Sequence, residues 1–289
     1  MYVHGDNLIQ KEGHTTKYLD ADSRTYLREI RAKYDEWKRA NELLIGPLST
    51  VTENDAEIIK KRVELFNNYK DFLDQQHYAE KFDSRSNLHS SVLEEFIYYL
   101  FKDLVAEFSA NALIGKSHAF KDIFFQPTSF KEMVDKPNAK IEKKDHDFVI
   151  GVNIQTSMTC EGSTNSQIEL LQVPAVAIEC KTYLDKTMLE GSSNAADQIL
   201  LRNPNAIYLV VAEWLKLTDK VNLKKYKVDQ IYVLRKQKNT DREFRFADTY
   251  IKNPIYEDVV SHLFNYVKNH LLSDWSGGTE QGLENGYLK

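Results

Sequence analysis

Apolar residues in the first part of the chain recur with the spacing of α-helices. Steps of three or four positions place side chains on one helical face, and one such stripe is formed by Leu27, Ile30, Tyr34 and Trp37. After a turn at Gly46-Pro47, a second stripe is formed by Ile59, Val63, Phe66, Tyr69 and Leu73. Its helix is expected to begin near Thr52. The pattern predicts a helical N-terminal region over residues 1–85 that serves core packing, subunit contacts or DNA contacts.

A third helix is predicted from Ser91, because Ser91 and Glu94 have the spacing of a capping box. Its apolar stripe is formed by Leu93, Phe96, Ile97, Leu100, Phe101 and Leu104. At about 100° per residue, Glu94 lies at the border of this stripe and Glu95 lies nearly opposite it. Glu94 is therefore either a helix cap or a side chain that approaches a site beside the core. Glu95 is expected to face water.

From about residue 120 the pattern changes to that of β-strands. Short apolar, β-branched runs predict strands at residues 147–152, 173–181, 206–212 and 230–234. The polar segment 156–167 is expected to be a turn or hairpin loop. Helices are predicted at residues 185–202 and around residues 259–271. The alternation indicates an α/β fold with a central sheet, in a core over residues 86–272 that is followed by a flexible tail over residues 273–289.

Composition narrows the class of protein. Of 289 residues, 42% are hydrophobic and 28% are charged, which is typical of a globular protein rather than a disordered or fibrous one. Because the chain contains no apolar run of about 18 residues and no secretory leader at its start, no membrane association is expected. Two cysteines, Cys160 and Cys180, cannot make a disulfide framework, and this favours a reducing cytoplasm.

The net charge of -5 does not predict a nucleic-acid partner by itself. One segment, residues 216–245, nevertheless carries ten lysines and arginines against four acidic residues. It is either an ordinary solvated face or a surface that contacts phosphates, in which case binding depends strongly on salt. Lys140, Lys143 and Lys144 are further candidates for phosphate contacts.

Charged residues at two strand ends form the candidate site. Asp147 opens one predicted strand, and Glu179 and Lys181 close the next. Since strand side chains alternate between faces, Glu179 and Lys181 project together while Cys180 points the other way. If the two strands are neighbours, Asp147 meets this pair. Asp145 competes as the first ligand, because alternation places it on the same face as Asp147.

Two carboxylates and one amine in a small volume suit phosphodiester hydrolysis. A hard divalent cation such as Mg²⁺ relieves the repulsion between the carboxylates, and it polarises a phosphoryl oxygen and lowers the pKa of a bound water. A nearby lysine orients the attacking water or stabilises charge in the transition state. The alternative is an ordinary surface ion pair, because a Glu-x-Lys pattern often arises by chance.

The residues around this site resemble a known superfamily. Asp147 with Glu179-Cys180-Lys181 is similar to the PD-(D/E)XK nuclease signature, with His146-Asp147 in place of the proline-aspartate half. Longer stretches resemble type II restriction endonucleases of the BbvCI kind. They are residues 91–96, 144–148, 178–189 and 231–236, within a resemblance that covers roughly residues 85–240.

The resemblance implies a mixed sheet of four or five strands flanked by helices, and Mg²⁺-dependent cleavage of double-stranded DNA in the bacterial cytoplasm. It implies that Asp147 and Glu179 are metal ligands, that Lys181 assists the water, and that Glu94 is an additional or outer-sphere metal contact. BbvCI-like enzymes pair two related subunits on a CCTNAGC-type site, and each subunit cuts one strand. This chain is then one subunit of a heterodimer, although a homodimer remains open.

Other interpretations remain open or are set aside. A repair or recombination nuclease that reads DNA structure, and a non-catalytic DNA-binding subunit, are the alternative functions. Gly115-Lys116-Ser117 is similar to the end of a P-loop, but Ala110 stands where that loop requires glycine, which argues against ATP use. His146 is expected to be a polar residue at a strand edge, and Tyr183 and Tyr208 are expected to be structural.

Overall fold

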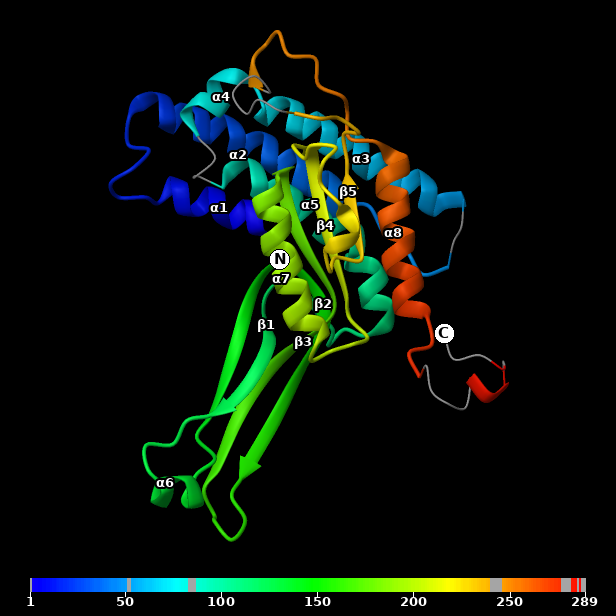
Figure 1. The fold of residues 1–289 in the computed structure, drawn as a ribbon. Coiled ribbons are helices and arrows are strands. Elements are labelled where there is room, and N and C mark those ends of the chain that lie inside the picture. The colour runs from blue at the N-terminus through cyan, green and yellow to red at the C-terminus, as the bar shows by residue number, and fades with distance from the viewer. Residues whose placement is uncertain are drawn as a thin grey trace.

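Five helices of the N-terminal half pack together on one side of a central sheet (Figure 1). The computed structural model describes residues 2–50, 53–82, 87–239, 246–276, 282–284 and 286. The helices are α1 (Val3–Glu12), α2 (Ala21–Glu42), α3 (Glu53–Leu73), α4 (Gln76–Lys81) and α5 (Leu88–Phe108). The apolar stripes predicted for α2 and α3 are buried, as their spacing required. The expected helix start at Thr52 lies outside the described residues.

A five-stranded mixed sheet forms the centre of the molecule, in the order β1-β2-β3-β4-β5. Its strands are β1 (Leu113–Phe125), β2 (Ala139–Thr159), β3 (Ser166–Leu184), β4 (Ile207–Leu215) and β5 (Gln230–Val233). Strands β1, β2 and β3 pair antiparallel, whereas β4 is parallel to both β3 and β5. This confirms the α/β class with a mixed sheet and N-terminal helices.

Helices cover both faces of the sheet where β3, β4 and β5 meet. On one face, α3, α5 and α8 (Glu257–Leu272) share a large apolar core with alternate strand residues such as Phe148, Ile178 and Cys180. On the other face, α7 (Lys186–Leu200) packs against Ala177 and Tyr208. Strand β4 is buried along nearly its whole length, because helices cover both of its faces. A short 3-10 helix, Leu223–Lys225, precedes β5.

The outer parts of β1, β2 and β3 extend away from the helices as an arm, with the short helix α6 (Phe130–Asp135) at its end (Figure 1). Strand β2 continues to Thr159 and β3 begins at Ser166, so the prediction of a loop over residues 156–167 was wrong at both ends. Cross-strand backbone pairing continues there although the side chains are polar. None of the helices in the described ranges is long and apolar enough to cross a bilayer.

Helix α5 corrects two expectations about its acidic residues. It begins at Leu88, three residues before Ser91, so Glu94 lies in the second turn and is not a capping residue. Glu95 is fully buried rather than facing water. Its carboxylate accepts hydrogen bonds from the backbone amides of His4 at 2.9 Å and Gly5 at 3.2 Å. Helix α1 packs on this face of α5, and Glu95 satisfies amides at the N-terminus of α1 that have no partner within their own helix.

Candidate active site

Strands β2 and β3 diverge at the candidate site. Their ladder ends at the pair Phe148 and Ile178. Beyond this pair β2 remains paired with β1, whereas β3 remains paired with β4. The ladder between β1 and β2 also shifts register at Gly115/Ser117, opposite the same part of β2. Such irregularities change the direction of side chains and are common next to active sites. Asp147 and Glu179 are the first residues beyond the point of divergence.

The side chains of Asp147, Glu179 and Lys181 meet between the diverging strands. The Nζ atom of Lys181 lies 3.0 Å from Oδ2 of Asp147 and 2.6 Å from Oε2 of Glu179. The backbone N–H of Cys180 also donates to Oδ2 of Asp147, at 2.9 Å. The three side chains are between 12% and 25% exposed, so they are shielded but reachable from solvent. Cys180 itself points into the core on the opposite face.

Glu94 brings a third carboxylate to this cluster from helix α5. Its side chain is 8% exposed, and Oε2 lies 3.7 Å from Nζ of Lys116. Burial, and then the negative charge of Asp147, raise the pKa of Glu94 to about 7. The second influence requires that Glu94 lies near Asp147, as expected for a side chain at the border of the apolar stripe.

The charges in the cluster do not balance. Burial and the charge of Glu179 raise the pKa of Asp147, although Lys181 opposes them. Burial would also raise the pKa of Glu179, but hydrogen bonding from His146 and the charge of Lys181 lower it to about 2. The two carboxylates hold Lys181 in its charged form by raising its pKa. Lys181 and the more exposed Lys116 beside Glu94 therefore supply two positive charges, against the three negative charges that the carboxylates carry when ionised.

His146 and Tyr208 contact the cluster from its buried side. Nδ1 of His146 lies 3.2 Å from Oε1 of Glu179, and the hydroxyl of Tyr208 donates to the same oxygen at 3.0 Å. Both residues are almost fully buried. The expectation that His146 is a polar residue at a strand edge was therefore wrong. In the sequence, only the position of His146 next to Asp147 indicated that it could contact the site. Tyr208 lies in an apolar run, so nothing in the sequence indicated its contact with Glu179.

Asp145 does not join the cluster. Its side chain is 75% exposed and pairs with His118 on β1. Strict alternation would have placed Asp145 beside Asp147, but the irregular register between β1 and β2 gives the two side chains different surroundings. Lys140, Lys143 and Lys144, which precede Asp145 on β2, are exposed.

The basic segment 216–245 is not a uniform phosphate-binding surface. Arg235 is fully buried and bonded to Glu213. The expectation that it lies on an exposed basic surface was therefore wrong. Lys236 pairs with Asp258 at 2.5 Å, and Lys238 pairs with Asp219 at 2.7 Å. The sequence gives no sign of these partners, because their positions depend on the fold. The remaining exposed lysines are Lys216, Lys220, Lys224, Lys225 and Lys227. Arg242 and Arg245 lie outside the described residues.

The donor set suits a hard cation that retains water. Within the described ranges, no three His, Cys, Asp or Glu side chains are already arranged as a metal site. Asp147 and Glu179 nevertheless supply oxygen ligands, and Oε2 of Glu94 is buried without a hydrogen-bond partner in the described part of the chain. Mg²⁺ typically binds one or two carboxylates and completes its shell with water and substrate phosphates. The residues present fit such an ion.

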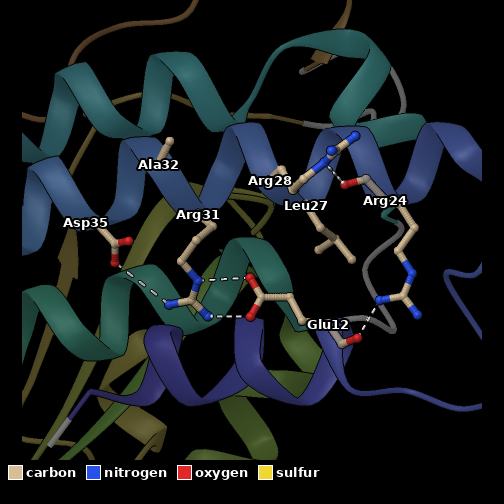
Figure 2. A pocket seen from close by; sticks show the side chains of 7 residues that line it. All are labelled: Glu12, Arg24, Leu27, Arg28, Arg31, Ala32 and Asp35. Carbon is tan, nitrogen blue, oxygen red and sulfur yellow. Dashed lines mark hydrogen bonds and ion pairs between the residues drawn. The ribbon is translucent and has the colours of Figure 1, made fainter.

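A separate hollow lies against helices α1 and α2. Figure 2 shows its charged lining, in which Arg31 bonds to the carboxylate of Glu12 and lies 3.9 Å from Asp35. Arg24 donates to the backbone carbonyl of Glu12. Its lining includes none of the residues of the strand cluster. These contacts explain the lining as structural ion pairs that hold α1 against α2.

Comparison with known proteins identifies the family. The Bpu10I restriction endonuclease family matches residues 85–288, which is more than half of the chain. The chain belongs to this family. It is therefore a type II restriction endonuclease, a site-specific deoxyribonuclease. The matched segment contains Glu94, Asp147, Glu179 and Lys181.

A solved structure supports the same fold. The chain resembles the structure described as the native BbvCI A2B2 tetramer at low resolution, with a TM-score of 0.67 and 19% sequence identity. The match covers 93% of this chain and 96% of the BbvCI chain, so it extends beyond the family match into the N-terminal helical region. No curated protein sequence matches significantly.

Proposed function

We propose that this restriction endonuclease is a Mg²⁺-dependent subunit that hydrolyses one strand of double-stranded DNA at a near-palindromic, CCTNAGC-type site. A second, related nuclease subunit cuts the other strand, and the enzyme acts in the bacterial cytoplasm. The observation that carries the proposal is the meeting of Asp147, Glu179 and Lys181 where β2 and β3 diverge. The A2B2 composition of the BbvCI assembly supports the pairing of two kinds of chain.

The residues of the cluster have distinct roles in this proposal. Asp147 and Glu179 hold the ion, and Glu94 contacts it directly or through water. When bound, Mg²⁺ supplies a Lewis acid for the phosphate and lowers the pKa of a water molecule. Lys181 remains charged beside both carboxylates, so its ammonium group orients the attacking water and stabilises negative charge on the phosphate.

The exposed lysines of β2 contact the DNA backbone in this proposal. Lys140, Lys143 and Lys144 lie on the strand that leads to Asp147, so they extend the active site along the duplex. Their contacts with phosphates position the scissile bond but carry no sequence information. The overall negative charge of the chain does not oppose this role, because DNA binding depends on the local distribution of charge.

Cleavage of a supercoiled plasmid that contains one recognition site tests the proposal. Glu179→Ala and Lys181→Ala should each abolish cutting of one strand, while specific binding to the site survives. Combined with an intact partner subunit, the variants should produce nicked circles instead of linear DNA. Lys186→Ala is the matched control, because Lys186 lies five residues after Lys181 on an element of the same core, is 66% exposed and lies outside the cluster.

Three results would contradict the proposal. Full double-strand cleavage by Lys181→Ala would remove this lysine from catalysis. Loss of site binding together with cleavage would make the cluster structural. Cleavage of branched DNA without a fixed site would instead favour a nuclease that reads DNA structure.

A further inference from the structure

The two oxygens of the Glu179 carboxylate have different surroundings. Oε2 faces Lys181 at 2.6 Å, on the side of the cluster that contains Asp147. Oε1 faces the protein interior, where it is bonded to the hydroxyl of Tyr208 at 3.0 Å and lies 3.2 Å from Nδ1 of His146. The carboxylate is therefore held from its buried side by two groups that belong to neither the ion pair nor the exposed opening.

Both of these groups are fixed by the sheet. His146 precedes Asp147 on β2, and Tyr208 lies on β4, so they reach Glu179 from the strands on either side of β3. The His146 ring meets the Tyr208 ring edge to face, with centroids 5.5 Å apart and planes at 78°. Tyr208 is fully buried among small apolar residues of β3 and α7, including Ala177, Ala195 and Ala196. Neither ring can move without disturbing the packing.

The polar contacts of His146 are directed at this carboxylate. Within the described part of the chain, its buried Nε2 atom has no hydrogen-bond partner. Its Nδ1 atom contacts Glu179 and, at 3.4 Å, the Tyr208 hydroxyl. A buried imidazole is costly unless its polar atoms are used. The contact with Glu179 is therefore what offsets the cost of burying His146.

Holding one oxygen fixes the direction of the other. A glutamate carboxylate rotates broadly about its last side-chain bond, and two donors on Oε1 stop this rotation. Oε2 then remains turned towards Lys181, which also contacts Asp147. Partners behind a metal ligand orient that ligand, and their removal typically lowers metal affinity or activity by about 10- to 100-fold.

We propose that His146 and Tyr208 are positioning residues, which hold Oε1 of Glu179 so that Oε2 is presented to the divalent ion. This inference rests on the proposed function of Glu179 as a metal ligand. It assigns no contact with DNA or with the reacting phosphate to either residue. It adds two residues to the site that lie outside the Asp147, Glu179 and Lys181 pattern.

Tyr208→Phe tests the role of the hydroxyl, because it keeps the packed ring. We expect the Mg²⁺ concentration for half-maximal cleavage to rise about tenfold. Binding of Mn²⁺ to the enzyme, followed by electron paramagnetic resonance as loss of the free-ion signal, should weaken by a similar factor. DNA binding without metal and the thermal unfolding midpoint should stay close to wild type.

Two substitutions at His146 separate positioning from packing. His146→Leu removes the Nδ1 donor, whereas His146→Asn keeps an amide nitrogen at the same place in the side chain. We expect His146→Leu to weaken Mn²⁺ binding about as much as Tyr208→Phe, and His146→Asn to restore most of it. Equal defects in both variants, or an unchanged Mn²⁺ affinity in Tyr208→Phe, would overturn the positioning role.

Glu179→Ala distinguishes failure of this inference from failure of the proposed function. If Glu179→Ala loses Mn²⁺ binding while Tyr208→Phe and His146→Leu keep it, Glu179 binds the ion without being positioned by His146 and Tyr208. If Glu179→Ala binds Mn²⁺ as wild type does, the metal site itself is elsewhere, and the proposed function and this inference both fail.

Discussion

Two clusters of charged side chains lie along the central sheet, and they differ in the balance of positive and negative charge. One is closed and consists of Lys70, Asp74, Glu213 and Arg235, whose side chains are at most 1% exposed. Lys70 lies 3.1 Å from Asp74 and 3.0 Å from Glu213, and Arg235 lies 3.1 Å from Glu213. Lys70, Arg235 and the partly exposed Lys252, which lies 3.4 Å from Asp74, neutralise the two buried carboxylates without any added ion.

The other cluster is the candidate active site. It combines Glu94, Asp147 and Glu179 with the central amine of Lys181 and the more exposed amine of Lys116, and solvent reaches it. In the closed cluster, the positive charge of Lys70 and a hydrogen bond from His89 outweigh burial and hold the pKa of Asp74 well below its usual value. In the site, the pKa values of Asp147 and Glu94 are raised. The same residue types thus stabilise the fold in the closed cluster, where positive and negative charges balance. In the active site, where negative charges exceed positive ones, they leave a place for a cation.

Breaking the closed cluster should have the largest effect on stability. Arg235→Leu removes one of the two fully buried cations that pair with Glu213 and Asp74, and the buried negative charge that is then only partly neutralised costs about 3–5 kcal/mol of unfolding free energy. The control Lys236→Leu removes the neighbouring, exposed lysine and should cost less than about 1 kcal/mol. Urea unfolding of both variants measures the difference. Equal losses of unfolding free energy in the two variants would show that the buried charges of the closed cluster contribute no more to stability than an exposed lysine does.

Removing a negative charge from the active site should raise the free energy of unfolding instead of lowering it. Because the pKa of Glu94 is raised in the folded protein, the folded state retains a proton that the unfolded state loses as the pH rises from about 4.5 to about 7. Ionisation in the folded site therefore destabilises the protein above this window. Glu94→Gln should gain up to about 3 kcal/mol of stability at pH 8, and almost nothing at pH 4.

Urea unfolding in EDTA at the two pH values measures this effect, since a bound cation would offset both the burial of the Glu94 charge and its repulsion by Asp147. Glu107→Gln provides a matched control near the other end of α5, where the side chain is exposed. A stability loss in Glu94→Gln at pH 8, or the same gain at both pH values, would show that ionised Glu94 does not destabilise the folded protein.

Much of the site could be predicted from the sequence because its residues lie at the ends of apolar runs. Alternation along a strand correctly separated Cys180 from Glu179 and Lys181, and helical periodicity placed Glu94 beside the core. These arguments use only neighbours along the chain. They succeed where the local backbone is regular.

The remaining features depend on contacts between distant segments. Glu95 is buried because α1, about ninety residues earlier in the chain, packs against it. Arg235 is buried because Glu213 and Asp74 receive its charge. Strand β1 and the outer parts of β2 and β3 were not predicted, because their backbone pairing with one another, rather than an unbroken apolar run, holds them in the sheet. No periodicity within a short window contains such information.

Removing charges outside both clusters should have the smallest effect. Lys143→Ala should weaken DNA binding at all sequences and lower the slope of log affinity against log salt by about 1. Lys33→Ala is a matched control on α2, where the lysine pairs with Glu36. Fluorescence anisotropy at several salt concentrations measures both slopes. If Lys143→Ala and Lys33→Ala have the same slope as wild type, β2 does not contact the backbone.

The central claim is that the carboxylate at the point where β2 and β3 diverge, and not its exposed neighbour, serves catalysis. Asp147→Asn and Asp145→Asn make the same chemical change two residues apart on one strand. Single-turnover cleavage at saturating Mg²⁺ should fall about a thousandfold for Asp147→Asn, which corresponds to about 4 kcal/mol, and should stay near wild type for Asp145→Asn. Equal losses, or a loss confined to Asp145→Asn, would contradict this account of the site.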